Sequence, residues 1–166
     1  MRILYTYILL GFFTLCSAVL SAQIGMSNSE MATILKELAV EKEGEPGNWH
    51  CVYNSHPIFV LTDETANRMR IFAPILEESE LKVGQMKAML EANFNSALDA
   101  KYSLYEGFVI SVFTHPLEEL TKDQFVNAMS QVVNLSKNFG SSYTSADLKL
   151  LEKPSVEKDK TIFKKS

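Results

Sequence analysis

The segment that decides the fold is residues 101–140, with the sequence KYSLYEGFVISVFT (101–114), HPLEEL (115–120) and TKDQFVNAMSQVVNLSKNFG (121–140). Glu106 and Gly107 separate two apolar segments, as expected of a β-hairpin with a short turn. Thr121 and Gln124 form a capping box at the start of a helix, and Gly140 is the glycine that ends it. The segment therefore predicts two paired strands followed by a long amphipathic helix.

The second strand of this hairpin is apolar on both faces. Phe108, Ile110 and Val112 point one way, and Val109 and Phe113 point the other way. A strand of this kind has to be covered on both sides. Helices on one face of the sheet leave the other face to a second copy or to a bound partner. The core-facing stripe predicted for the following helix is Phe125, Ala128, Met129, Val132, Leu135 and Phe139.

The residues before this segment predict a helix, three strands and a second helix. Ser27 and Glu30 form a capping box that begins a helix over residues 28–41. Strands are expected at 49–53, 58–61 and 68–75, and a second helix at 77–94. The predicted core stripe of that helix is Val83, Met86, Leu90, Phe94 and Ala97. The predicted fold is therefore α+β, α-β-β-β-α-β-β-α, with a five-stranded mostly antiparallel sheet packed against helices.

The first 22 residues predict export. Arg2 is followed by an almost wholly apolar stretch and then by small residues before Gln23, the pattern of a secretory signal peptide. A membrane anchor is the alternative, because residues 3–20 just reach the length that crosses a bilayer. We expect a signal peptide at 1–22, one domain at 23–144 and a flexible lysine-rich tail at 145–166. The expected location is periplasmic or secreted, without stable membrane insertion after cleavage.

The composition and the few reactive side chains give no catalytic signature. The formal net charge of −4 argues against nucleic-acid binding, which needs a clustered basic surface. His50 and Cys51 are neighbours on a predicted strand, so they point to opposite faces and do not readily share a metal ion with His56. Cys51 is expected to be buried. We predict no catalytic, cofactor or metal site.

Apolar positions along the second half of the chain resemble those of a known fold. They lie in residues 90–94, in the hairpin over 104–113, in the turn at 115–120 and in the closing helix. Together they resemble the type III secretion chaperone-like fold, including the YbjN-type relatives. The resemblance implies a small acidic homodimer that binds other polypeptides along an extended apolar surface. Such chaperones act in the cytoplasm, whereas this chain carries an export signal.

The function predicted from the sequence is an exported, non-catalytic, chaperone-like module that recognises a protein or peptide through an apolar sheet surface. The residues predicted to contact the partner are Arg68, Arg70, Phe72, Val109 and Phe113. Two alternatives remain open at this stage. One is a constitutive subunit of an envelope complex, and the other is an enzyme with dispersed catalytic residues.

Overall fold

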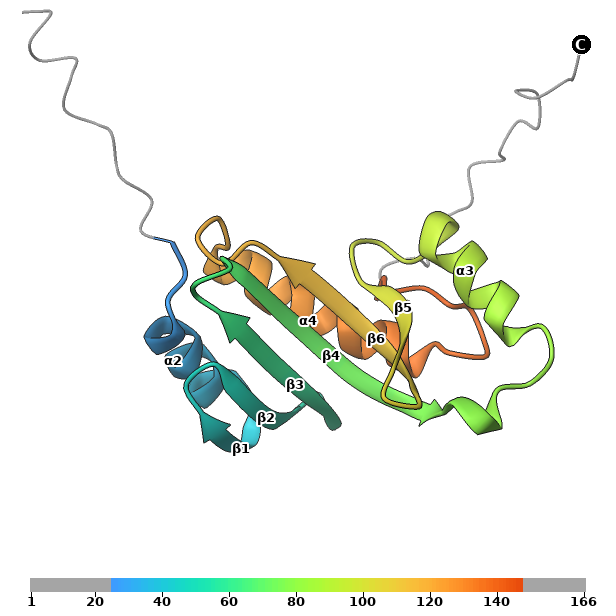
Figure 1. The fold of residues 1–166 in the computed structure, drawn as a ribbon, viewed down its shortest axis with the longest axis horizontal. Helices are drawn as coiled ribbons and strands as arrows, with labels where there is room; N and C mark the ends of the chain where they lie inside the picture. The colour runs from blue at the N-terminus through green and yellow to red at the C-terminus, as the bar shows by residue number, and fades with distance from the viewer. Residues whose placement is uncertain (1–24, 148–166) are drawn as a thin grey trace, which may run out of the picture.

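A six-stranded antiparallel sheet forms the body of the molecule, with the strand order β1-β2-β3-β4-β6-β5 (Figure 1). This computed structural model describes residues 25–147. The elements in chain order are α2 (Asn28–Leu38), β1 (Val40–Glu45), β2 (Asn48–Tyr53), β3 (His56–Asp63), β4 (Arg68–Glu77), η1 (Glu78–Glu80), α3 (Gln85–Asn95), β5 (Lys101–Tyr105), β6 (Phe108–His115) and α4 (Lys122–Lys137). The predicted α+β class is confirmed.

Helix α4 lies along one face of the sheet, behind β4 and β6 in Figure 1, and the other face is open. Alternation along the strands separates the two faces. Met69, Ile71 and Ala73 of β4 are buried on the helix side. On β6 the buried positions on that side include Val109 and Phe113. One apolar core therefore joins the sheet to α4, and the open face is left for other contacts.

Both predicted capping boxes are present. The Ser27 hydroxyl accepts a hydrogen bond from the Glu30 amide at 3.3 Å, and the Glu30 carboxylate accepts from the Ser27 amide at 2.9 Å. At α4, Thr121 and Gln124 make the equivalent pair of bonds. These bonds satisfy amides that would have no partner in the first turn of a helix. Helices α2 and α4 consequently begin where their capping boxes predicted.

The sheet has six strands rather than the predicted five, because α2 ends at Leu38 and the chain enters β1 at Val40. The sequence of β1 is VEKEGE, and five of its six residues are exposed. It forms the edge of the sheet, where backbone pairing with β2 holds it without buried apolar side chains. Gly47, with φ +92°, completes the tight turn from β1 into β2.

The predicted second helix is wrong in its start and in its buried face. Glu77 still belongs to β4, and α3 begins only at Gln85. The residues of α3 that reach the core are Met89 and Ala92. The predicted stripe is exposed except for its last member, Ala97: the exposed residues are Val83, Met86, Leu90 and Phe94. This segment therefore carries two apolar stripes. The smaller stripe, Met89 and Ala92, is buried where α3 packs against β5, and the longer predicted stripe faces outward.

Helix α3 also closes the outer edge of β5. The side-chain amide of Asn93 accepts a hydrogen bond from the Tyr102 amide at 2.7 Å and donates one to the Tyr102 carbonyl at 3.1 Å. A neighbouring strand would make the same two bonds. Lys101 Nζ donates to the carbonyls of Asn93 and Leu98 at 2.7 and 2.6 Å, and so caps the carboxyl end of the helix.

Gln131 of α4 joins the helix to the loop before β5. It is 5% exposed, and its Oε1 accepts hydrogen bonds from the amides of Asp99 (2.9 Å) and Ala100 (3.1 Å). Its Nε2 donates to the carboxylate of Asp99 at 3.1 Å and to the side chain of Asn127 at 2.6 Å. All of its polar atoms are therefore used inside the protein.

The predicted signal peptide at 1–22 and most of the predicted tail lie outside the described residues. The first tail residues are described: Ser145 is buried, and its hydroxyl accepts a hydrogen bond from the Leu98 amide at 2.7 Å. Among the helices of residues 25–147, none is both long and apolar enough to cross a membrane.

Candidate binding surface

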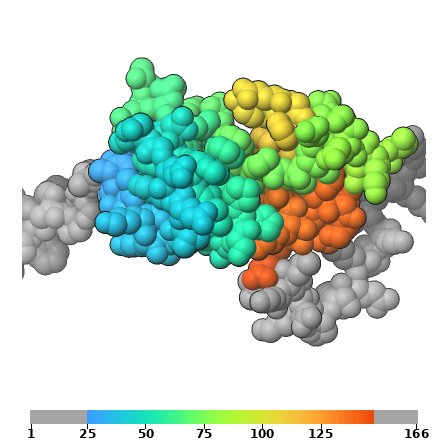
Figure 2. Space-filling model, turned by 90° about the horizontal axis from the view of Figure 1, so that it is seen from below, coloured from blue at the N-terminus to red at the C-terminus, as the bar shows by residue number. Residues whose placement is uncertain are grey.

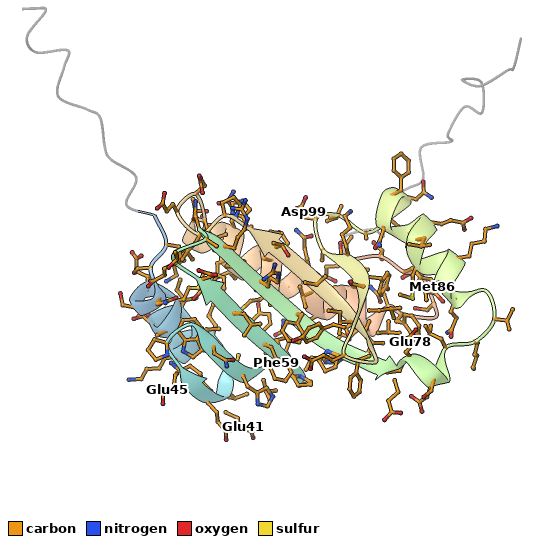
Figure 3. The ribbon with its side chains drawn as sticks, in the orientation of Figure 1. Glu41, Glu45, Phe59, Glu78, Met86 and Asp99 are labelled. Carbon is orange, nitrogen blue, oxygen red and sulfur yellow. The ribbon has the colours of Figure 1, made fainter. Side chains whose placement is uncertain are left out.

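A row of rings crosses the open face of the sheet, roughly perpendicular to the strands. Phe59 of β3 stands between its two strand partners, His50 of β2 and Phe72 of β4. The ring centroids of His50 and Phe59 are 4.7 Å apart and those of Phe59 and Phe72 are 4.9 Å apart, both stacked. Tyr105 of β5 then meets Phe72 edge-on at 5.7 Å. Figure 3 labels Phe59 on this face.

Two adjoining hollows of about 440 and 490 Å³ lie on this face, one after the other along β4 and β6. Both are lined by Leu61, Phe72, Tyr105 and Ile110. Because they share these four residues, we describe them together as the open-face trough. The first hollow is completed by Arg70, Ser103, Leu104, Val112 and Thr114. The second is completed by Asn48, Phe59, Pro74, Glu106 and Phe108.

The structure brings three of the five predicted contact residues together on the open face. Arg68 and Arg70 are exposed there, and Phe72 is half-buried between its ring neighbours. The other two, Val109 and Phe113, lie in the core and present no surface to a partner. The hairpin strand is apolar on both faces, so its sequence does not indicate which face the helix covers. The face toward α4 is the one that also carries Ser111, whose hydroxyl donates to the Val132 carbonyl at 2.8 Å.

Five residues of the ring row and of the shared floor were not among the predicted contacts: His50, Phe59, Leu61, Tyr105 and Ile110. His50 was considered only as a metal ligand, yet its ring is part of the row. Leu61 is the last residue of the strand predicted at 58–61, whereas β3 continues to Asp63, and Tyr105 is the last residue of β5. Alternation along β2 could have placed His50 on the open face, because its neighbours Trp49 and Cys51 are both buried on the other side.

The reactive side chains do not converge on this surface. Cys51 is fully buried on the helix side, and burial raises the pKa of its thiol to about 11, which keeps it protonated and unreactive at neutral pH. The Nδ1 of His115 lies 2.7 Å from the Pro116 carbonyl, a local contact at the end of β6. Within residues 25–147 no group of three His, Cys, Asp or Glu side chains is arranged to hold a metal ion.

A second exposed apolar surface lies on α3, the segment that projects at one end of the molecule in Figure 2. Phe94 is 91% exposed and Leu90 is 64% exposed, and Val83 and Met86 continue the same stripe toward the start of the helix. Figure 3 labels Met86 on this helix, well away from Phe59. We call these four residues the α3 stripe. Its size on a small domain is typical of an interaction surface.

No protein-family model matches the chain, and no curated protein matches it. Solved structures do. The Yersinia pestis type III secretion chaperone SycH, solved with a stable fragment of YscM2, has a TM-score of 0.52 and 13% identity, and the match covers 68% of this chain and 98% of that one. The ExsC–ExsE complex contains a chain with a TM-score of 0.50 and 16% identity, covering 68% and 92%. These likenesses show that the chain has a type III secretion chaperone-like fold.

Proposed function

We propose that this protein is a non-catalytic, chaperone-like module that binds an extended polypeptide on the open face of its sheet. The observation that carries the proposal is the row of four rings from His50 to Tyr105, which lies on the face that no described helix covers. Rings at this spacing form a continuous row across the open face, from β2 to β5. SycH and ExsC–ExsE were solved as complexes with other polypeptides, which agrees with this proposal.

The energetics are sufficient for binding without any chemical step. Fully burying a Phe or Leu side chain contributes roughly 1.5–3 kcal/mol. Association costs at least about 4 kcal/mol in lost translational and rotational freedom. Four fully buried apolar side chains at the upper end of this range contribute about 12 kcal/mol and leave about 8 kcal/mol of net binding free energy, a dissociation constant of about 1 μM, and fewer side chains leave a weaker affinity.

The direct test is binding of a polypeptide that cannot fold. Reduced, carboxymethylated α-lactalbumin carrying a fluorescent label is titrated with the purified protein, and fluorescence anisotropy reports the complex. We expect saturable binding, and native α-lactalbumin serves as the folded control. Equal binding of the native and unfolded forms, or no binding of either, would contradict the proposal.

We further propose that two copies associate through the α3 stripe. Met86, Leu90 and Phe94 lie on one face of α3 at spacings of four, and Val83 precedes the helix. All four are exposed, so a two-fold axis beside α3 would bury the stripe of each copy against the other. The protein should have twice the monomer mass by light scattering. Because a symmetric interface loses each contact twice, Leu90→Glu should weaken the dimer by roughly 100-fold or more.

Leu38→Glu is the matched control for the dimer experiment, since Leu38 is 42% exposed at the end of α2 rather than on α3. It should leave the mass unchanged. A wild-type protein that is monomeric at tens of micromolar would refute the dimer.

The final part of the proposal is that the module acts after export, in the periplasm or outside the cell. The support is the apolar stretch at 3–20 followed by small residues before Gln23. We expect the protein recovered from a bacterial host to begin near Gln23 when its amino terminus is sequenced. A chain that begins at Met1 and sediments with membranes would instead mean that the first segment is an anchor.

A further inference from the structure

Each hollow of the open-face trough contains one charged residue, and the two charges are opposite. Arg70 is the single charged residue that lines the first hollow, and Glu106 is the single one that lines the second. The shared floor between them is formed by Leu61, Phe72, Tyr105 and Ile110. The trough is therefore apolar in the middle, with a positive charge in one part and a negative charge in the other.

The guanidinium of Arg70 is available to a ligand. It makes no ion pair or hydrogen bond with any residue in the described range 25–147. Its strand partners are Leu61 on β3 and Thr114 on β6, which offer an apolar side chain and a hydroxyl but no carboxylate. Ser103 adds a second hydroxyl to the same hollow. An arginine without a partner beside an apolar floor favours a carboxylate, which it binds through two parallel hydrogen bonds.

The environment of Glu106 differs from that of Arg70. It occupies the β5–β6 turn with φ +49°, and its carboxylate lies by Tyr105, where it raises the pKa of the phenol. Its charge discourages a second carboxylate at this end of the trough. An acidic group on a ligand is thus attracted to one end and repelled from the other, which sets the orientation of the ligand.

The length of the trough indicates the size of the ligand. Phe108 lines the second hollow and Thr114 lines the first, and they are six residues apart on β6. At 3.3 Å per residue this is about 20 Å, the length of roughly six extended residues. A ligand of that length with apolar groups between its ends is a short polypeptide segment.

We propose that the trough binds an extended polypeptide segment in which an acidic side chain, placed on Arg70, precedes or follows a run of apolar side chains. The acidic residue sets register and orientation, and the apolar residues fill the floor between Leu61 and Ile110. This inference rests on the proposed function and adds the chemistry of the partner to it.

The test uses fluorescein-labelled heptapeptides with one apolar core, Leu-Ser-Phe-Ser-Leu, and with Asp, Ser or Lys at either end. Anisotropy titrations compare their affinities for the full-length protein. A charge-assisted hydrogen bond should favour the peptides with one Asp over the Ser peptides by about tenfold. Arg70→Gln should abolish this preference, and Arg70→Glu should invert it in favour of Lys.

Arg68→Glu is the matched control. Arg68 lies on the same strand face and is exposed, but it lines neither hollow and donates a hydrogen bond to the Asn67 carbonyl at 2.8 Å. The same charge change at this position should leave the preference for Asp intact. An equal effect of both substitutions would assign the preference to the general charge of the face and refute the inference.

Other outcomes separate this inference from the proposed function. Binding that depends on the apolar core but ignores the end charges would refute the inference and retain the function. Binding of none of the peptides, together with failure to bind unfolded α-lactalbumin, would refute both. Binding that appears only after residues 148–166 are removed would mean that the chain's own tail, which contains Leu150, Leu151 and Glu152, occupies the trough.

Discussion

Phe72→Asp should weaken polypeptide binding by about 100-fold or more and leave the fold intact. Phe72 lines both hollows and stands in the middle of the ring row, 4.9 Å from Phe59 and 5.7 Å from Tyr105. The substitution removes roughly 1.5–3 kcal/mol of apolar burial in the complex and adds a carboxylate that any apolar ligand must desolvate. The side chain faces away from the core, so the cost in folding free energy is limited to its two ring contacts, about 1–3 kcal/mol.

The measurements are the affinity for unfolded α-lactalbumin and the thermal unfolding followed by circular dichroism. Leu38→Asp is the control, because it places the same charge on an exposed apolar residue of α2. Phe72→Leu should retain most of the affinity. If Phe72→Asp and Leu38→Asp bind equally well, the open face is not the binding surface.

Gln131→Leu should lower the free energy of unfolding by about 2–4 kcal/mol, since it leaves the amides of Asp99 and Ala100 without their acceptor in a buried region. Leucine is similar in size to glutamine, so no large cavity forms. The decrease in the free energy of unfolding therefore measures the loss of the hydrogen bonds. Urea denaturation measures the change, and an unaltered m-value shows that the unfolding transition is the same.

Gln85→Leu is the matched control for this stability experiment. Gln85 Oε1 also accepts a backbone hydrogen bond, from the Lys82 amide at 2.7 Å, but in an exposed segment where water can replace it. The Gln85→Leu substitution should change the free energy of unfolding by no more than about 0.5 kcal/mol. Equal stability of Gln131→Leu and the wild type would show that the Asp99–Ala100 loop finds other partners.

Local signals correctly predicted the starts of α2 and α4, the hairpin and the sides of the strands. The capping boxes at Ser27 and Thr121 give helix starts because they satisfy specific amides. Glu106 and Gly107 both have positive φ, as the turn between two paired strands requires. Alternation on β4 placed Arg68, Arg70 and Phe72 on one face. Each of these features depends on residues close together in the chain.

The features that the sequence did not predict depend on contacts between distant residues. β1 carries no apolar alternation, and its pairing with β2 makes it a strand. On the α3 segment the longer apolar stripe favoured burial of Leu90 and Phe94, but the helix packs against β5 and buries Met89 and Ala92 instead. In each case two arrangements satisfy the local pattern, and the tertiary structure selects one.

The bonds between Asn93 and Tyr102 have a consequence for solubility. A sheet polymerises by adding strands at its edges, and growth needs two open edges on every copy. Here Asn93 already occupies the outer amide and carbonyl of Tyr102 on one edge, and the other edge, β1, carries Glu41, Glu43 and Glu45, which repel the same edge of another copy. Both edges are therefore poor templates for an added strand, which disfavours growth of the sheet by edge-to-edge pairing.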